Sequence, residues 1–172
     1  MEAQIDIAGP DLFASSQPQY SMLWQAPEAE VFGLCRANDI SQIVWSPLAQ
    51  GVLTGKYLPG GSDAPADSRA KGPEGGEMGW LLRDEVLEPV QAYAALCREA
   101  GYTPASVALA WVLRNENVSS AIVGASRPEQ IVENVKALDI ELEPDFVAAI
   151  EKVLEPTTLF DPAFTFSPNP RP

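Results

Sequence analysis

The sequence contains no histidine, few basic residues and only two cysteines. Lysine and arginine together number 11 against 24 aspartates and glutamates, so the formal net charge is −13 at pH 7. Such an acidic chain lacks the basic patches that nucleic acids and anionic membranes require, and we expect it to bind neither. Without histidine it offers no imidazole base and no histidine-ligated metal site, and we predict no metal site.

The cysteines and the absence of long apolar runs bear on where the protein resides. Cys35 and Cys97 each lie within an apolar helical pattern, which is typical of reduced thiols in a protein core. Residues 1–9 lack the basic start and the apolar run of a signal peptide. The longest apolar stretches are far shorter than the ~20 residues that a membrane span requires. We therefore expect a soluble, cytoplasmic protein.

Short strands alternate with helices along the 172 residues. The hydrophobic pattern predicts strands at residues 12–16, 41–45 and 119–123. It predicts helices from Pro27 through residue 35, and at 84–100, 104–113, 126–138 and 144–154. This alternation indicates a parallel sheet of βα units, whose closed eight-stranded form takes ~250 residues. The chain is therefore expected to be a fragment of such a barrel.

Two segments are rich in glycine or proline. Residues 58–79 are expected to form a long loop, and loops of that length are often functional lids. The tail at 156–172 holds five of the sixteen prolines and is expected to be extended or poorly ordered.

A first candidate anion site follows the second predicted strand. Residues 45–57 read Trp-Ser-Pro-Leu-Ala-Gln-Gly-Val-Leu-Thr-Gly-Lys-Tyr. In a βα barrel the loops after the last two strands often bind a phosphate. The small residues would let backbone amides approach an anion, and Lys56 would add positive charge. The alternative is an ordinary turn with a solvated Lys56.

A second candidate anion site lies at residues 124–134. A predicted strand runs there into a helix, and the free amides and positive dipole end of a helix N-terminus attract phosphate. Arg127 can reach the same anion, and residues 126–129 fit a capping box. The alternative is an ordinary capped amphipathic helix. Its polar face carries Gln130, Glu133 and Asn134, and its apolar face carries Ile131, Val135 and Leu138.

Three motifs in this order resemble the carboxyl-terminal half of an aldo-keto reductase. They are Gln17-Pro18-x-Tyr20-Ser21, the stretch 45–56, and Gly124-x-Ser126-x-x-x-Gln130-x-x-Glu133-Asn134. The likeness runs from about residue 12 to 154 and is strongest to bacterial reductases related to potassium-channel β subunits. It implies an α/β fold, a partial (β/α)8 TIM barrel of about the last three βα units with a C-terminal helix. Residues 1–155 would form this half-barrel, and 156–172 an extended tail.

The resemblance further implies that the chain binds NADP(H). Gln17 would hydrogen-bond the nicotinamide carboxamide, Trp45 would stack on the nicotinamide ring, and Arg69 would lie over the cofactor. Residues near Lys56 would surround the pyrophosphate, and the third motif would hold the adenosine end. The full set implied is Gln17, Trp45, Ser46, Pro47, Leu48, Ala49, Gly51, Thr54, Lys56, Arg69, Gly124, Ser126, Arg127, Gln130, Glu133 and Asn134.

The catalytic tetrad of that family does not match this chain. It comprises an aspartate, a tyrosine, a lysine and a histidine, all carried by the first half of the barrel. The four tyrosines here lie outside the Asp-x-x-x-x-Tyr arrangement, and Lys56 matches the cofactor loop. We therefore assign no catalytic residue. Carbonyl reduction is expected when a second polypeptide supplies the missing half. The alternatives are a self-associating, non-catalytic NADP(H)-binding or interaction module and an inactive truncated remnant.

Overall fold

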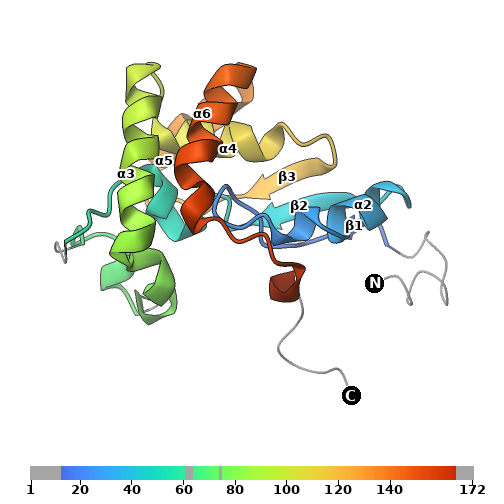
Figure 1. Ribbon diagram of the computed structural model, residues 1–172, viewed down its shortest axis with the longest axis horizontal. Helices are drawn as coiled ribbons and strands as arrows, with labels where there is room; N and C mark the ends of the chain where they lie inside the picture. Colours follow the sequence, from blue (N-terminus) through green and yellow to red (C-terminus); the bar gives the residue numbers. More distant parts are fainter. Residues whose placement is uncertain (1–12, 61–63, 74, 166–172) are drawn as a thin grey trace.

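The described part of the chain forms a three-stranded parallel sheet with helices packed against it (Figure 1). A computed structural model describes residues 13–60, 64–73 and 75–165. The strands are β1 (Ser15–Ser16), β2 (Ser41–Trp45) and β3 (Val118–Ile122), in the order β1-β2-β3. The predicted parallel sheet of βα units is therefore confirmed. Residue 12 of the first predicted strand lies outside the described residues, and β3 is shifted by one residue from its predicted position.

Within the described residues the α-helices are α2 (Val31–Arg36), α3 (Asp84–Glu99), α4 (Pro104–Leu113), α5 (Pro128–Val135) and α6 (Pro144–Leu154). The helix expected from Pro27 is a 3-10 turn, η2 (Ala26–Glu28), followed by α2. The start of α4 is as predicted, because Thr103 Oγ1 accepts a hydrogen bond from the Ser106 amide at 3.2 Å. No described helix has the length and apolar character needed to cross a membrane.

The core lies between the helices and one face of the sheet. Along β2 the side chains alternate, so that Gln42 and Val44 are fully buried while Trp45 is exposed. Helices α3 and α6 lie side by side (Figure 1), and Tyr93 of α3 and Ile150 of α6 are fully buried in this core. One face of the sheet is thus covered by helices and the other is partly open. An α/β arrangement of this kind is consistent with part of the predicted barrel.

The segment expected to be a long loop contains helical turns. They are η4 (Arg69–Lys71) and η5 (Gly75–Leu82). Met78 and Leu81 of η5 are buried in the main core. Composition predicts the loop correctly as a whole, but the two apolar side chains anchor its second half to the body of the protein.

The tail is extended only in part. Its described residues include the 3-10 turns η7 (Glu155–Thr157) and η8 (Pro162–Thr165). Between these turns the Leu159 amide donates to the Leu23 carbonyl at 3.0 Å, and the Gln25 amide donates to the Leu159 carbonyl at 2.9 Å. The ring of Phe164 packs edge-on against Trp24. This stretch is therefore docked, and residues 166–172 lie outside the described residues.

The two cysteines are free and buried, Cys35 in α2 and Cys97 in α3. Burial raises the pKa of the Cys97 thiol to about 11. That thiol is consequently protonated and unreactive near neutral pH, in keeping with the predicted core thiols.

We expect Gly55→Ala to lower the free energy of unfolding by about 2 kcal/mol. Gly55 has a φ of 73°, and a Cβ there would lie 2.9 Å from the Cβ of Ala94 on α3. The substitution therefore combines backbone strain with overpacking. Urea denaturation measures the effect. In the control Gly33→Ala, the new Cβ meets nothing within 4 Å, and stability should rise slightly because Gly33 lies inside α2. A Gly55→Ala variant as stable as the wild type would contradict this account.

Candidate functional site

A cleft of about 700 Å³ opens where β2 and β3 end. Because β2 and β3 are parallel, their carboxyl ends meet at one edge of the sheet, and the segments that follow them lie together. A third segment, from the loop before η4, completes the cleft. The lining residues are Trp45, Ser46, Pro47, Leu48, Gln50, Gly51, Lys56, Asp67, Ser68, Arg69, Ile122, Val123, Gly124, Ala125, Ser126, Arg127, Gln130 and Asn134.

The loop after β2 has an unusual backbone. Ser46, Ala49 and Gln50 have positive φ angles of 58°, 46° and 56°, although none is glycine. Residues held in this region cost roughly 1–3 kcal/mol each, and they cluster at functional sites. Hydrogen bonds from the amides of Gly51 and Leu53 to the Leu48 carbonyl hold the loop in this form. This backbone makes the loop a candidate for part of a functional site.

Lys56 lies directly over Gly51 in this loop. A Cβ added at Gly51 would lie 3.3 Å from both Cε and Nζ of Lys56. A glycine at this position therefore leaves room for the lysine side chain. The ammonium group lies 5.2 Å from the centre of the Tyr57 ring, and Lys56 has no carboxylate partner among the described residues. Its positive charge is therefore available to an anion in the cleft.

The N-terminus of α5 forms the opposite wall. Gln130 Oε1 accepts hydrogen bonds from the amides of Ser126 at 2.8 Å and Arg127 at 3.3 Å. The residue that closes this end of the helix is therefore Gln130 and not Glu129, which corrects the predicted capping box. Arg127 Nη1 donates to Asp67 Oδ2 at 2.9 Å, which joins this wall to the loop before η4.

Most of the predicted site residues line the cleft, but Gln17, Ala49, Thr54 and Glu133 do not. Ala49 is buried in the loop after β2. Thr54 Oγ1 donates to the Gly51 carbonyl at 2.7 Å and so stabilises that loop. Gln17 is exposed and precedes Pro18, whose carbonyl accepts from the Trp45 amide at 3.1 Å.

Glu133 faces the start of α4. Its carboxylate accepts hydrogen bonds from Lys136 Nζ at 2.6 Å and from Thr103 Oγ1 at 3.0 Å. These bonds, that of Lys136 first, lower the pKa of Glu133. In this structure Glu133 therefore links α5 to α4. The predicted adenine contact stays a prediction.

Sequence reasoning missed several cleft residues, of which Asp67 and Ser68 matter most. Ser68 is buried, and its hydroxyl has no hydrogen-bond partner. The sequence marks these two residues only by their position, immediately before Arg69 in the same loop. An unpaired buried hydroxyl beside the cleft is a ready contact for a polar ligand.

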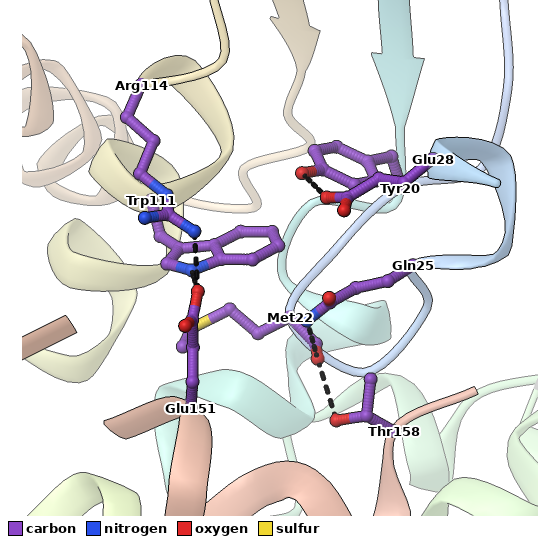
Figure 2. Close-up of polar contacts among 8 residues, drawn as sticks. All are labelled: Tyr20, Met22, Gln25, Glu28, Trp111, Arg114, Glu151 and Thr158. Atoms are coloured by element: carbon purple, nitrogen blue, oxygen red, sulfur yellow. Dashed lines mark hydrogen bonds and ion pairs between the residues drawn. The ribbon is translucent and has the colours of Figure 1, made fainter. Parts of the chain in front are cut away.

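A second polar cluster lies among the helices and is already fully paired (Figure 2). Trp111 Nε1 donates to Glu151 Oε1 at 2.8 Å, and Arg114 forms an ion pair with the same carboxylate. In the same view, Gln25 and Thr158 both donate to the Met22 carbonyl, so the tail is fixed to the segment after β1. This cluster therefore holds α4, α6 and the tail together, and it has a structural role.

One further pair in Figure 2 joins Tyr20 to Glu28. The Tyr20 hydroxyl donates to Glu28 Oε1, and burial, followed by the nearby carboxylate, raises the pKa of Tyr20 above its ordinary value. The phenol therefore stays protonated and hydrogen-bonded to Glu28, so it is not available as a proton donor.

The cleft combines positively charged side chains with an exposed aromatic ring. Lys56 and Arg127 lie along it as cations, and the unpaired Ser68 hydroxyl offers a further polar contact. Trp45 presents an indole that is 43% exposed at the rim. Groups of these kinds can hold an anion and a flat ring. Within the described part of the chain, no three His, Cys, Asp or Glu side chains gather as metal ligands.

The sequence is similar to proteins of one family. The model of the Aldo/keto reductase family matches residues 3–155. A probable voltage-gated potassium channel β subunit of Oryza sativa subsp. japonica is 39% identical over 156 residues, 88% of this chain and 46% of that protein. The NADH-specific methylglyoxal reductase of Escherichia coli K12 is 38% identical over 133 residues, 73% of this chain and 37% of that protein.

A third relative is the L-glyceraldehyde 3-phosphate reductase of Escherichia coli O157:H7, 38% identical over 129 residues, 72% of this chain and 36% of that protein. This chain spans less than half the length of each of these relatives. The family match covers all three segments that line the cleft and nearly all of the described fold. The chain therefore belongs to the aldo/keto reductase family.

Proposed function

We propose that this chain is the NADP(H)-binding half of an aldo-keto reductase. It would take part in NADPH-dependent carbonyl reduction once the missing half of the barrel is supplied, by a second polypeptide or by a further part of the same protein. The observation that carries the proposal is the single cleft shared by the loop after β2 and the start of α5. Its free, buried cysteines suit a reducing compartment such as the cytoplasm.

Each wall of the cleft has a distinct task in this proposal. Trp45 stacks on the nicotinamide ring, because flat aromatic surfaces pack well on flat heterocycles. Lys56 and the backbone around Gly51 hold the pyrophosphate, and the segment from Gly124 to Asn134 holds the adenosine end. When bound, NADPH supplies the hydride that reduces a carbonyl carbon. The protein side chains described here position that ligand and neutralise its charge.

The proton donor that carbonyl reduction requires is missing from the cleft. No tyrosine, histidine or cysteine is among its lining residues. The hydroxyl of Tyr93 donates to the Pro104 carbonyl at 2.6 Å, and that of Tyr20 donates to Glu28. We therefore propose that the acid comes from the half of the barrel that this chain does not span.

Titration of the whole chain with NADPH, followed by the fluorescence of the nucleotide, tests the proposal. We expect saturable binding, and we expect Trp45→Ala to weaken it by about five- to tenfold through the lost stacking. Phe160→Ala, which removes an aromatic ring of similar exposure from the tail, should leave the affinity unchanged. Undetectable binding by a folded sample would overturn the assignment.

One observation favours the alternative of a self-associating, non-catalytic module. Apolar side chains of α5 and the turn after it are more than half exposed: Ile131, Val132, Val135 and Leu138. Exposed patches of this kind mark interaction surfaces, and a second copy of the chain could cover this one. Light scattering of the pure protein distinguishes the two ideas, because a monodisperse monomer would leave self-association without support.

A further inference from the structure

An ion pair joins two of the segments that line the cleft. Arg127 Nη1, at the N-terminus of α5, donates to Asp67 Oδ2 at 2.9 Å, and the two residues are 60 positions apart in the sequence. Both line the cleft, and among the described lining residues Asp67 alone carries a carboxylate. Asp67 therefore adds a negative charge to the cleft, whose other described ionisable lining residues are the basic Lys56, Arg69 and Arg127.

The ion pair is open to solvent and weak enough to exchange. The side chains of Arg127 and Asp67 are 60% and 64% exposed. Pairs this exposed contribute little to stability, because water and salt screen them. A ligand with a negative group can therefore compete with Asp67 for the guanidinium. A negative group bound to Arg127 would also lie near the displaced Asp67 carboxylate, which repels it.

We infer that Asp67 weakens the preference of the cleft for NADP(H) over NAD(H), because its carboxylate disfavours the 2′-phosphate. The inference rests on the proposed function, which places the adenosine end beside Arg127. A 2′-phosphate there competes with Asp67 for Arg127 and is repelled by the displaced carboxylate. A free 2′-hydroxyl meets no such repulsion and can donate a hydrogen bond to a carboxylate, as riboses do elsewhere. Asp67 thus lowers the affinity for NADP(H) relative to NAD(H).

The test measures the dissociation constants of NADPH and NADH for the wild type and for Asp67→Asn. Asparagine keeps the size and the hydrogen-bonding oxygen but removes the charge. We expect NADPH to bind about five- to tenfold more tightly to the variant, the size of one solvent-exposed charge interaction, with little gain for NADH. The difference should shrink at high salt. In the double variant with Arg127→Ala, most of the gain should be lost.

The control is Asp39→Asn, the same charge change at the exposed turn before β2, away from the cleft lining. It should leave the ratio of the two affinities unchanged. If Asp67→Asn changes both affinities by the same factor, or changes neither, the inference is wrong while the proposed function stands. If neither dinucleotide binds the wild type or the variant, both are overturned. Because Asp67 is exposed, its replacement should not impair folding, and thermal unfolding checks this.

Discussion

Lys56→Ala should weaken NADPH binding by about 10- to 100-fold, the range expected for one charge-assisted hydrogen bond to a phosphate. The structure places this ammonium over Gly51 with no carboxylate to compensate its charge among the described residues, so an anion in the cleft is its natural partner. Titration at low and moderate salt measures the effect. The loss should be smaller at high salt, because the interaction is electrostatic.

The matched control for this prediction is Lys152→Ala. Lys152 is an exposed lysine on α6, outside the cleft, so its replacement by alanine removes the same charge. Its replacement should leave the affinity nearly unchanged. Equal effects of the two substitutions would mean that net charge, and not a specific contact, governs binding. If Lys56→Ala bound NADPH as tightly as the wild type does, Lys56 would not be part of the binding site.

Replacing Ile131 and Val135 together by aspartate should abolish reconstitution with the missing half of the barrel. In a (β/α)8 barrel each helix packs over the strands on either side of it. Helix α5 follows β3, which is an edge of the described sheet, so no strand here covers its apolar face. Ile131 and Val135 are each 55% exposed. Two charges buried there would cost several kcal/mol, which is enough to prevent assembly.

The measurement is NADPH-dependent carbonyl reduction after co-expression with a polypeptide that carries the first half of the barrel. We expect activity with the wild type and none with the double variant. Leu58→Asp provides the control, since Leu58 is a similarly exposed apolar residue that follows the 3-10 turn η3 (Ala49–Thr54). The isolated double variant should unfold at the same urea concentration as the wild type, because the two replaced side chains are more than half exposed and belong to no core cluster. Retained activity of the double variant would place the interface elsewhere.

The sequence predicts the secondary structure well where a single physical signal dominates. The helix at 104–113 has both its N-cap at Thr103 and Pro104 at its first position, and α4 has these bounds. The strand at 41–45 stops at Ser46-Pro47, as β2 does. Met78 is different: it lies in a glycine-rich stretch, and only the fold shows that it is buried. Composition predicts a loop there but not its attachment to the core.

The candidate site divides in the same way. Motifs supply the residues that follow β2 and β3, because chain order fixes which loops share an edge of a parallel sheet. They do not supply Asp67, whose importance depends on a partner 60 positions away. They also do not reveal that Glu133 is held by Lys136 and Thr103. Contacts between distant side chains depend on tertiary packing, which no local pattern encodes.

In the proposed function two separate segments form one dinucleotide site, which an NMR titration of the whole chain with NADPH would detect. Backbone amides of residues 46–56 and 124–134, and the indole N–H of Trp45, would be followed in ¹H–¹⁵N spectra. We predict that both segments and the indole shift together and saturate with one dissociation constant. Shifts confined to one segment, shifts located elsewhere, or no shifts in a folded sample would contradict the account.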